Sequence, residues 1–422
     1  MKTKIATVKG ARDFYPEQMA LRSWLYANMR AAAQAFGYQE YDGPFLETLD
    51  LYAAKSGEEL VKEQAFVFND RGGDQITLRP ELTPSLARMV AARQGQLPRP
   101  IRWWSFGPFW RYERPQKGRS REFFQWNVDL LGVDSPAADA ELAGVMAAFF
   151  RNIGFGPAEI KIQFNNRRLM DSEIAALGLT EQKKDVFRLI DRRDKLSAEA
   201  WDKYAADLGV TAEQLAGLKA MLANRELWRQ SEECQAFLTA AAALGIADFL
   251  EYDPTVIRGL DYYTGTVFEA RDREGEFRAI LGGGRYDNLV GDVGGDRLPG
   301  VGFAMGDVVI GLVAQKYGKV GALRTSPSDV LVTVFNAETL PQSLQLAAEL
   351  RAAGLRAEWY PEPVKLDRQL KYADATGVRF AAILGPDELA QGLVMLKDLA
   401  NRTQTPVVRQ QLAGLIQEKG RQ

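Results

Sequence analysis

The spacing of apolar residues changes character several times along this 422-residue chain, and these changes constrain its fold most strongly. Up to about residue 164, helical stretches mix with strand-like runs, whereas residues 165 to 250 show almost only helical periodicity. Strand and glycine signals return between residues 257 and 313, and a linker with glycine, proline and serine follows near Ser326. A chain of this length and pattern cannot close around one core.

The pattern therefore predicts two domains. Residues 1–325 are expected to form a mixed α+β domain, interrupted by a helical insertion at about 165–250. Residues 326–422 are expected to form a compact α/β domain, because short apolar strands alternate there with helices that end at glycine. The chain has no apolar run long enough to cross a bilayer and no secretory signal at its start, so we expect a cytoplasmic protein.

The chain contains no histidine and a single cysteine, Cys234. A Ser-His-Asp triad, a Cys-His pair and an imidazole general base are therefore excluded, and the common type of zinc site is nearly impossible. One cysteine cannot form an internal disulfide, which fits a reducing compartment. The remaining side chains, chiefly carboxylates, arginines and tyrosines, suit reactions at phosphates, because those reactions need charge placement more than proton relays.

A local basic segment stands out, although the net charge is only −2. It contains five basic residues against one acidic residue, Glu113, and Pro115 and Gly118 mark a turn between aromatic flanks. This pattern predicts a hairpin with a basic loop, and arginine forks suit polyphosphate. Composition alone favours an ordinary solvated hairpin equally. The five basic residues are Arg111, Arg114, Lys117, Arg119 and Arg121.

Several segments together resemble one family. RYERPQKGRSREFFQ resembles motif 2 of class II aminoacyl-tRNA synthetases, in the form typical of histidyl-tRNA synthetases. KGARDFYPE resembles that family's N-terminal signature, and GYQEYDGPFLETLDLY resembles motif 1, with Pro44 in the motif's proline position. TLRPELTPSLAR, VIRGLDYYTGTVFEA and LGGGRYDNLV resemble segments of its amino-acid site. The tail resembles an anticodon-binding domain, so the resemblance covers nearly the whole chain.

The resemblance implies a class II catalytic domain, an antiparallel sheet flanked by helices, followed by an anticodon-binding domain. It implies ATP-dependent ligation of L-histidine to tRNA(His) through histidyl-adenylate, with release of AMP and pyrophosphate. The implied partners are ATP with substrate-associated Mg²⁺, L-histidine, tRNA(His) and a second copy of the chain bound through motif 1. Neither zinc nor a membrane is expected.

The resemblance also implies a histidine pocket. Glu81 and Thr83 are two residues apart, so on a strand they would share a face and could hold the substrate's α-amine. A polar pair at a sheet edge is the alternative. Gln125 and Asp129 are four apart on the returning strand of the hairpin, so they also face together and could bind an imidazole. Residues of the opposite face are expected in the core: Trp126, Val128 and Leu130.

Arg258 and the Tyr262–Tyr263 pair complete the implied site. The resemblance implies that Arg258 and Arg111 clamp the α-phosphate while Tyr262 and Tyr263 line the histidine pocket, although such residues are more often surface charges and core or sheet-surface tyrosines. The implied ATP-binding residues are Arg111, Glu113, Arg119, Arg121 and Arg258. The implied tRNA-binding residues are Arg114, Gln116, Lys117 and Arg119.

Three glycines, Gly282 to Gly284, precede RYDNL and would let backbone approach a ligand, here as the floor of the amino-acid pocket. A dinucleotide fingerprint is a weak alternative, because its third glycine is missing.

The chain departs from the family pattern at three positions. In LPGVGFAMGDVVIGLV, which matches motif 3, the family's nucleotide-binding arginine is replaced by Val309 and its acidic neighbour by Val308. A family histidine in motif 2 is Phe124 here. An aliphatic side chain provides neither cation–π stacking nor phosphate pairing, so the sequence does not explain how ATP is held.

Two alternative functions follow from the same residues. One is a synthetase-like regulatory subunit of ATP phosphoribosyltransferase, which would bind histidine without charging tRNA. The intact basic hairpin and the full-length tail disfavour it, because such subunits typically lose both. The other is a class II synthetase for a different amino acid, which RGLDYY disfavours.

Overall fold

The computed structural model describes residues 5–53, 63–114, 118–258, 262–321 and 323–420. The chain divides into two compact units. The first contains residues 1–13 and 22–321, and the second contains residues 14–21 and 322–422. Among the described residues, no helix is both long and apolar enough to span a membrane.

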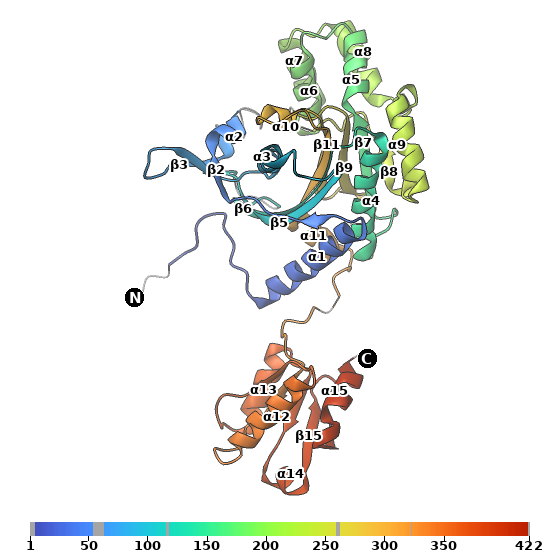
Figure 1. The fold of residues 1–422 in the computed structure, drawn as a ribbon. Helices are drawn as coiled ribbons and strands as arrows, with labels where there is room; N and C mark the ends of the chain where they lie inside the picture. The colour runs from blue at the N-terminus through green and yellow to red at the C-terminus, as the bar shows by residue number, and fades with distance from the viewer. Residues whose placement is uncertain (1–4, 54–62, 115–117, 259–261, 322, 421–422) are drawn as a thin grey trace. The chain divides into compact units, whose positions relative to one another are not determined.

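An eight-stranded sheet forms the centre of the first unit (Figure 1). Its six central strands pair antiparallel, as expected, whereas the two edge strands, β1 and β8, pair parallel to their neighbours. In sheet order the strands are β1 (Gln39–Glu40), β5 (Ile101–Trp110), β6 (Glu122–Leu131), β11 (Gly300–Gly306), β10 (Leu281–Tyr286), β9 (Thr266–Asp272), β7 (Ile160–Asn166) and β8 (Leu250–Tyr252).

One face of this sheet is packed in the core and the other forms a cavity. On β6, Trp126, Val128 and Leu130 are almost fully buried, as the alternation predicts, and Trp126 packs against Phe149 of α4. Between residues 16 and 316, the described α-helices outside the insertion are α1 (Pro16–Ala35), α2 (Leu49–Ala53), α3 (Thr83–Arg93), α4 (Pro136–Asn152), α10 (Leu289–Asp292) and α11 (Asp307–Lys316). A second, three-stranded antiparallel sheet has the order β2 (Leu46–Thr48), β4 (Gln75–Leu78), β3 (Phe66–Asn69).

Five α-helices and three short 3₁₀ helices lie between β7 and β8 (Figure 1). Local capping explains several helix starts: Asn166 caps α5, and Thr211 with Gln214 forms a capping box on α8. The α-helices are α5 (Arg167–Ala176), α6 (Lys183–Asp191), α7 (Ala198–Asp207), α8 (Ala212–Ala223) and α9 (Glu232–Ala243). The 3₁₀ helices are η2 (Arg193–Lys195), η3 (Leu227–Gln230) and η4 (Ala247–Phe249).

The second unit contains its own mixed five-stranded sheet, of order β13-β12-β14-β15-β16. The strand and helix alternation predicted for the tail is confirmed, and its core forms around residues such as Val330, Leu346 and Phe380. Its elements are β12 (Val330–Val332), α12 (Leu340–Ala352), β13 (Ala357–Trp359), α13 (Leu366–Thr376), β14 (Phe380–Ile383), α14 (Pro386–Gln391), β15 (Leu393–Asp398), β16 (Thr403–Val408), η5 (Arg409–Gln411) and α15 (Leu412–Gly420).

Candidate active site

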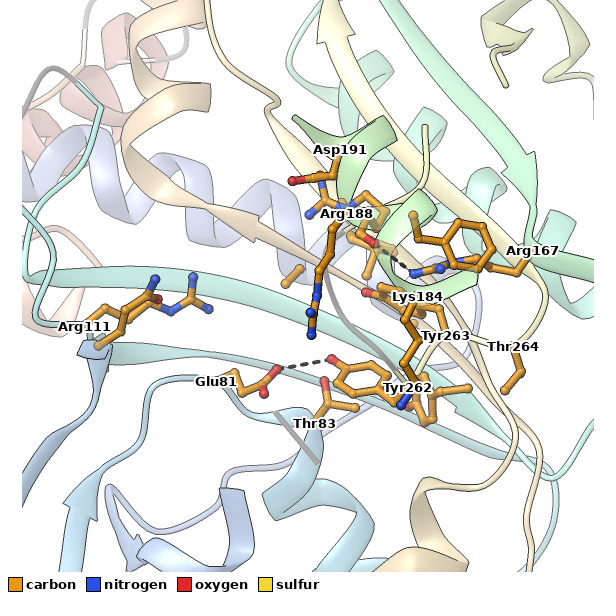
Figure 2. A pocket seen from close by; sticks show the side chains of 18 of the residues that line it. Glu81, Thr83, Arg111, Arg167, Lys184, Arg188, Asp191, Tyr262, Tyr263 and Thr264 are labelled. Carbon is orange, nitrogen blue, oxygen red and sulfur yellow. Dashed lines mark hydrogen bonds between the residues drawn. The ribbon is translucent and has the colours of Figure 1, made fainter. Parts of the chain in front are cut away.

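A cavity of about 1210 Å³ opens over the face of the central sheet that carries the alternate residues of β6. Gln125, Asn127 and Asp129 line it together, because side chains two apart on a strand point to the same face. Side chains from distant segments complete the wall, as Figure 2 shows for several of them. The expected site residues in this wall are Glu81, Thr83, Arg111, Arg119, Gln125, Asp129, Arg258, Tyr262 and Tyr263.

Glu81 and Thr83 both line the cavity: Glu81 lies in the connection between β4 and α3, and Thr83 lies at the start of α3. The expectation that they share a strand is wrong: β4 ends at Leu78, and Thr83 is the first residue of α3. The two prolines of the segment explain the difference, because proline cannot donate to a strand ladder and Pro84 favours a helix start. The two residues nevertheless lie together, and the Tyr262 hydroxyl donates to Glu81 Oε2 over 3.2 Å (Figure 2).

Asp129 is a buried carboxylate in the wall of the same cavity. Its side chain is 3% exposed, and the Tyr286 hydroxyl donates to its Oδ1 over 2.6 Å. Burial raises the pKa of Asp129 to about 7, only partly opposed by the Tyr286 hydrogen bond. On β11, Gly302 pairs with Asp129, and a Cβ at Gly302 would overlap this carboxylate. Only glycine therefore leaves Asp129 its place.

Asn127 lies between Gln125 and Asp129 on the cavity face of β6. Its side chain is 3% exposed, and its Nδ2 has no hydrogen-bond partner among the described residues. A buried donor without a partner costs free energy, which a bound acceptor would recover. Tyr263 lines the same cavity, and burial raises the pKa of its hydroxyl to about 12, so this hydroxyl stays protonated and can donate.

Arg258 is held in an unusual conformation beside the cavity. Its φ of 60° lies in the left-handed region that non-glycine residues rarely adopt. Its Nη1 pairs with Glu269 Oε2 at 2.5 Å, and the Arg167 Nη2 donates to its carbonyl oxygen over 2.9 Å. Burial acts to lower the pKa of Arg258, but Glu269 outweighs it and the pKa is raised. The guanidinium therefore remains charged where it meets the cavity.

Arg111 enters the cavity from the end of β5. Its Nε donates to the Pro80 carbonyl oxygen over 2.9 Å, and its guanidinium carbon lies 5.3 Å from the centre of the Phe123 ring. Arg111, Arg258 and Phe123 also line an adjoining cavity of about 220 Å³. Val308 and Val309 also line this second cavity. The two motif 3 positions at which the chain departs from the family pattern therefore lie in the same cavity wall as Arg111 and Arg258.

The basic hairpin is confirmed, because β5 and β6 pair antiparallel and the Arg111 N–H donates to Arg121 O over 2.9 Å. Glu113 and Arg119 both line the second cavity and form an ion pair of 3.2 Å. Arg121 lines neither cavity; its guanidinium stacks over Tyr112, 3.9 Å from the ring centre. Arg114 is exposed and also lines neither cavity, and Gln116 and Lys117 lie outside the described residues.

The three consecutive glycines of β10 have different roles. A Cβ at Gly282 would overlap the guanidinium of Arg258, whereas a Cβ at Gly283 would overlap the backbone of Gly302 and Phe303 on β11. A Cβ at Gly284 would crowd the Thr266 carbonyl oxygen and the Tyr263 ring. Of the three, only Gly282 lines either cavity, so the glycines do not together form the expected floor of the pocket. Their main role is to let the strands and the site residues pack closely.

Sequence reasoning missed the contribution of the helical insertion. Arg188 of α6 extends into the larger cavity, with Glu81 and Tyr262 across from it (Figure 2). Arg167 is 7% exposed, lies 4.3 Å from the Phe187 ring centre and supports Arg258. The basic character of α6 is visible in the sequence, but nothing in the sequence shows which helix face meets the cavity. Other missed lining residues include Phe123, Asn127, Arg278 and Tyr286, of which the alternation along β6 could have revealed Asn127.

Phe124, which replaces the family histidine, is a packed core residue. Its side chain is 8% exposed, and the Arg22 guanidinium carbon lies 3.4 Å from its ring centre. Its backbone N–H donates to Asp307 Oδ1 over 3.1 Å, and Asp307 also pairs with Arg12 at 2.9 Å. Position 124 therefore serves packing and is absent from both cavity walls.

Comparisons with known proteins agree with this geometry. The family model for histidyl-tRNA synthetase matches residues 10–307, and that for an anticodon-binding domain matches residues 329–419. Curated proteins named histidine–tRNA ligase from Opitutus terrae and Natronomonas pharaonis are 39% and 36% identical, each over 98% of both chains. A crystal structure of histidyl-tRNA synthetase from a Nostoc species superimposes with a TM-score of 0.85 at 25% identity, covering 99% of this chain and 100% of that one. The chain therefore belongs to the histidyl-tRNA synthetase family.

Proposed function

We propose that this chain is a histidine–tRNA ligase, which joins L-histidine to tRNA(His) in two steps at the expense of ATP. One observation carries the proposal. A single cavity combines a carboxylate suited to an amine, Glu81, a buried carboxylate suited to an imidazole, Asp129, and two arginines suited to a phosphate, Arg111 and Arg258. Amine, imidazole and phosphate are the groups that histidine and ATP would bring together.

In the first step, a carboxylate oxygen of histidine attacks the α-phosphorus of ATP. A new P–O bond forms, the bond to the bridging oxygen breaks, and pyrophosphate leaves with its electron pair. Arg111 and Arg258 flank the α-phosphate and offset the charge that builds up on it. ATP enters as its magnesium complex. Glu113 and Arg119 lie with Arg258 along the second cavity, the one of about 220 Å³, which we call the nucleotide cavity.

Histidine is held at its two ends. Glu81 and Thr83 bind the α-ammonium group, and the hydrogen bond from Tyr262 keeps the Glu81 carboxylate in place. Asp129 accepts from one imidazole N–H, while Gln125 and the Tyr263 hydroxyl complete the polar set around the ring. The Asn127 Nδ2, which has no hydrogen-bond partner among the described residues, gives a further donor to the same ligand.

The second step transfers the histidyl group to the 3′ end of tRNA(His). Residues 1–325 carry out catalysis in this proposal, and residues 326–422 bind the anticodon arm. The basic loop of motif 2 approaches the acceptor end, through Arg114, Gln116, Lys117 and Arg119. In the second unit, α13 and the residue before it carry exposed basic side chains, Lys365, Arg368 and Lys371, suited to phosphate contacts.

The chain acts as a cytoplasmic homodimer in this proposal. Motif 1 runs into the three-stranded sheet of the first unit, and large apolar side chains are exposed there: Phe45, Leu46, Val67 and Phe68. Exposed large apolar side chains are typical of protein interfaces.

Histidine-stimulated exchange between ATP and pyrophosphate separates this proposal from the regulatory alternative. The ligase reading predicts robust exchange with histidine and none with other amino acids. Thermal shifts with histidine, histidinol and ATP, each alone, measure binding independently, because a ligand of the folded state raises apparent stability. Stabilisation by histidine without any exchange would support the regulatory subunit.

Gly282→Ala is expected to slow adenylate formation about 100-fold with little loss of stability. The added Cβ would overlap the mobile end of Arg258, which can move aside but then leaves its position at the phosphate. Gly283→Ala is the matched comparison, because its Cβ would meet backbone atoms of β11 that cannot move freely. Exchange rates and melting temperatures should therefore separate the two: Gly282→Ala loses activity, and Gly283→Ala loses stability. Equal behaviour of both variants would contradict the role of Gly282.

A further inference from the structure

At position 309 this chain lacks the positive charge that an arginine provides in the family pattern. Val308 and Val309 both line that cavity, and neither can pair with a phosphate. In the family pattern an arginine stands at position 309. If ATP is to be bound here with its terminal phosphates neutralised, the positive charge has to come from another segment.

Arg278 lies at the same end of the sheet, in the segment that leads into the neighbouring strand β10. In the β10–β11 pair, Leu281 lies opposite Met305, the last pairing at that end. Arg278 lies three residues before Leu281, and Val309 lies four residues after Met305. The segment before β10 is fixed by the Ile280 N–H, which donates to the Ala270 carbonyl oxygen over 2.8 Å. Arg278 and Val309 both line the nucleotide cavity, so the arginine lies in the same cavity wall as the substituted position.

Arg278 differs from the other arginines of this cavity because the described residues offer it neither an ion pair nor a hydrogen bond. The other three are already held: Arg111 by a carbonyl oxygen, Arg119 by Glu113 and Arg258 by Glu269. Arg278 is exposed, so a ligand can reach it.

The charge around Arg278 favours an anion. Four arginines line the cavity against two carboxylates, Glu113 and Asp307, and Asp307 already pairs with Arg12 at 2.9 Å. Although the residue is exposed at the surface, partial burial of its guanidinium, followed by the nearby charge of Arg119, lowers the pKa of Arg278, and Glu113 only partly opposes this. Excess positive charge is unfavourable in the free protein and is relieved when a polyanion binds.

We propose that Arg278 pairs with the terminal phosphates of ATP and so takes over the charge missing at position 309. This assignment rests on the proposed ligase function. The planar guanidinium forms two parallel hydrogen bonds to phosphate oxygens, and it does so from the segment before β10 instead of from the helix that follows β11. Arg278 binds the part of ATP that leaves as pyrophosphate, while Arg111 and Arg258 act at the α-phosphate.

Kinetics of the Arg278→Met variant test this assignment. The KM for ATP in histidine-dependent exchange should rise about 10- to 100-fold, the range expected for a lost charge-assisted hydrogen bond, while the KM for histidine changes less than twofold. Arg273→Met is the matched control. It removes the same charge from the same connecting segment, but Arg273 pairs with Glu251 at 3.7 Å and lines neither cavity, so its KM for ATP should equal that of the wild type.

A second-site rescue makes the test specific. Val309→Arg in the Arg278→Met background should recover at least tenfold of the lost ATP affinity, because it restores a cation to the cavity at the family position. A purely structural role of Arg278 would not be rescued in this way. An unchanged KM for ATP in Arg278→Met, or a failure of Val309→Arg to restore it, would overturn the assignment.

The wild-type assay keeps the two proposals distinguishable. Wild-type exchange with an unaffected Arg278→Met variant removes only the role of Arg278. Absence of wild-type exchange removes the ligase function, and the assignment with it. Melting curves with histidine alone check that each variant remains folded, and Arg278→Lys, which retains the charge, should show a smaller increase in KM than Arg278→Met.

Discussion

Replacement of Arg258 by alanine is expected to lower the rate of histidyl-adenylate formation by about 100- to 1000-fold, the loss typical when one preorganised charge stabiliser is removed. Arg258 is one of four arginines that line both cavities, and Glu269 and the Arg167 hydrogen bond to its carbonyl oxygen hold it in position. The fold should survive, because alanine leaves the left-handed φ of 60° no more strained than arginine does. Glycine at this position should even relieve about 1 kcal/mol of backbone strain while losing the same activity.

Arg271→Ala is the appropriate comparison for this variant. Arg271 pairs with the other oxygen of the same Glu269 carboxylate at 2.5 Å, yet it lines neither cavity. Both substitutions remove one partner of Glu269, and only Arg258→Ala removes the cation that we propose lies at the reacting phosphate. Exchange assays should therefore show a loss of less than tenfold for Arg271→Ala. Similar losses in the two variants would mean that Arg258 acts only as a partner of Glu269.

Replacement of Asp129 by asparagine is expected to weaken histidine binding by about 10- to 100-fold and, at the same time, to stabilise the free protein above pH 7. Binding weakens because an amide cannot pair with the imidazole as a carboxylate does. Stability rises because a buried carboxylate is costly to ionise, and asparagine can still accept the hydrogen bond from Tyr286. Such opposite effects are typical of a residue kept for function at the expense of stability.

The sign of the pH effect follows from the pKa of Asp129. Its ordinary value is 3.8, and burial raises it to about 7 in the folded protein. Between these values the folded state binds more protons than the unfolded state, so stability falls as pH rises towards 7. The whole shift corresponds to about 4 kcal/mol at most. Melting curves of both proteins from pH 4 to 8 should diverge in favour of the Asp129→Asn variant; parallel curves would contradict an ionisable, buried Asp129.

The features that sequence could predict are those that depend on local periodicity. The alternation along β6 correctly separated Gln125 and Asp129 from the core residues, because a strand has a period of two whatever it packs against. The turn residues likewise predict the basic hairpin, and the spacing of apolar residues predicts the alternation of strands and helices in the tail. The spacing of Glu81 and Thr83 predicts a strand, whereas the two flanking prolines end the strand and start a helix there.

The features that sequence could not predict depend on which segments become neighbours. Arg278 acquires its place only when β10 pairs with β11, and that register is not encoded in the local pattern around residue 278. The same holds for Arg167, whose contact with the Arg258 carbonyl joins the insertion to the catalytic sheet. The left-handed φ of Arg258 likewise exists only because its surroundings impose it. Tertiary contacts therefore decide how the nucleotide half of the site is built.

Aminoacylation of tRNA(His) by the purified full-length chain tests the central claim most directly. The experiment supplies ATP, Mg²⁺, labelled L-histidine and a tRNA(His) transcript, and it follows the label into acid-precipitable tRNA. We expect charging that depends on ATP and on histidine, that is absent with tRNAs of other specificity, and that falls with adenylate formation in Arg258→Ala. Histidine binding without any charging of tRNA(His) would contradict the ligase function.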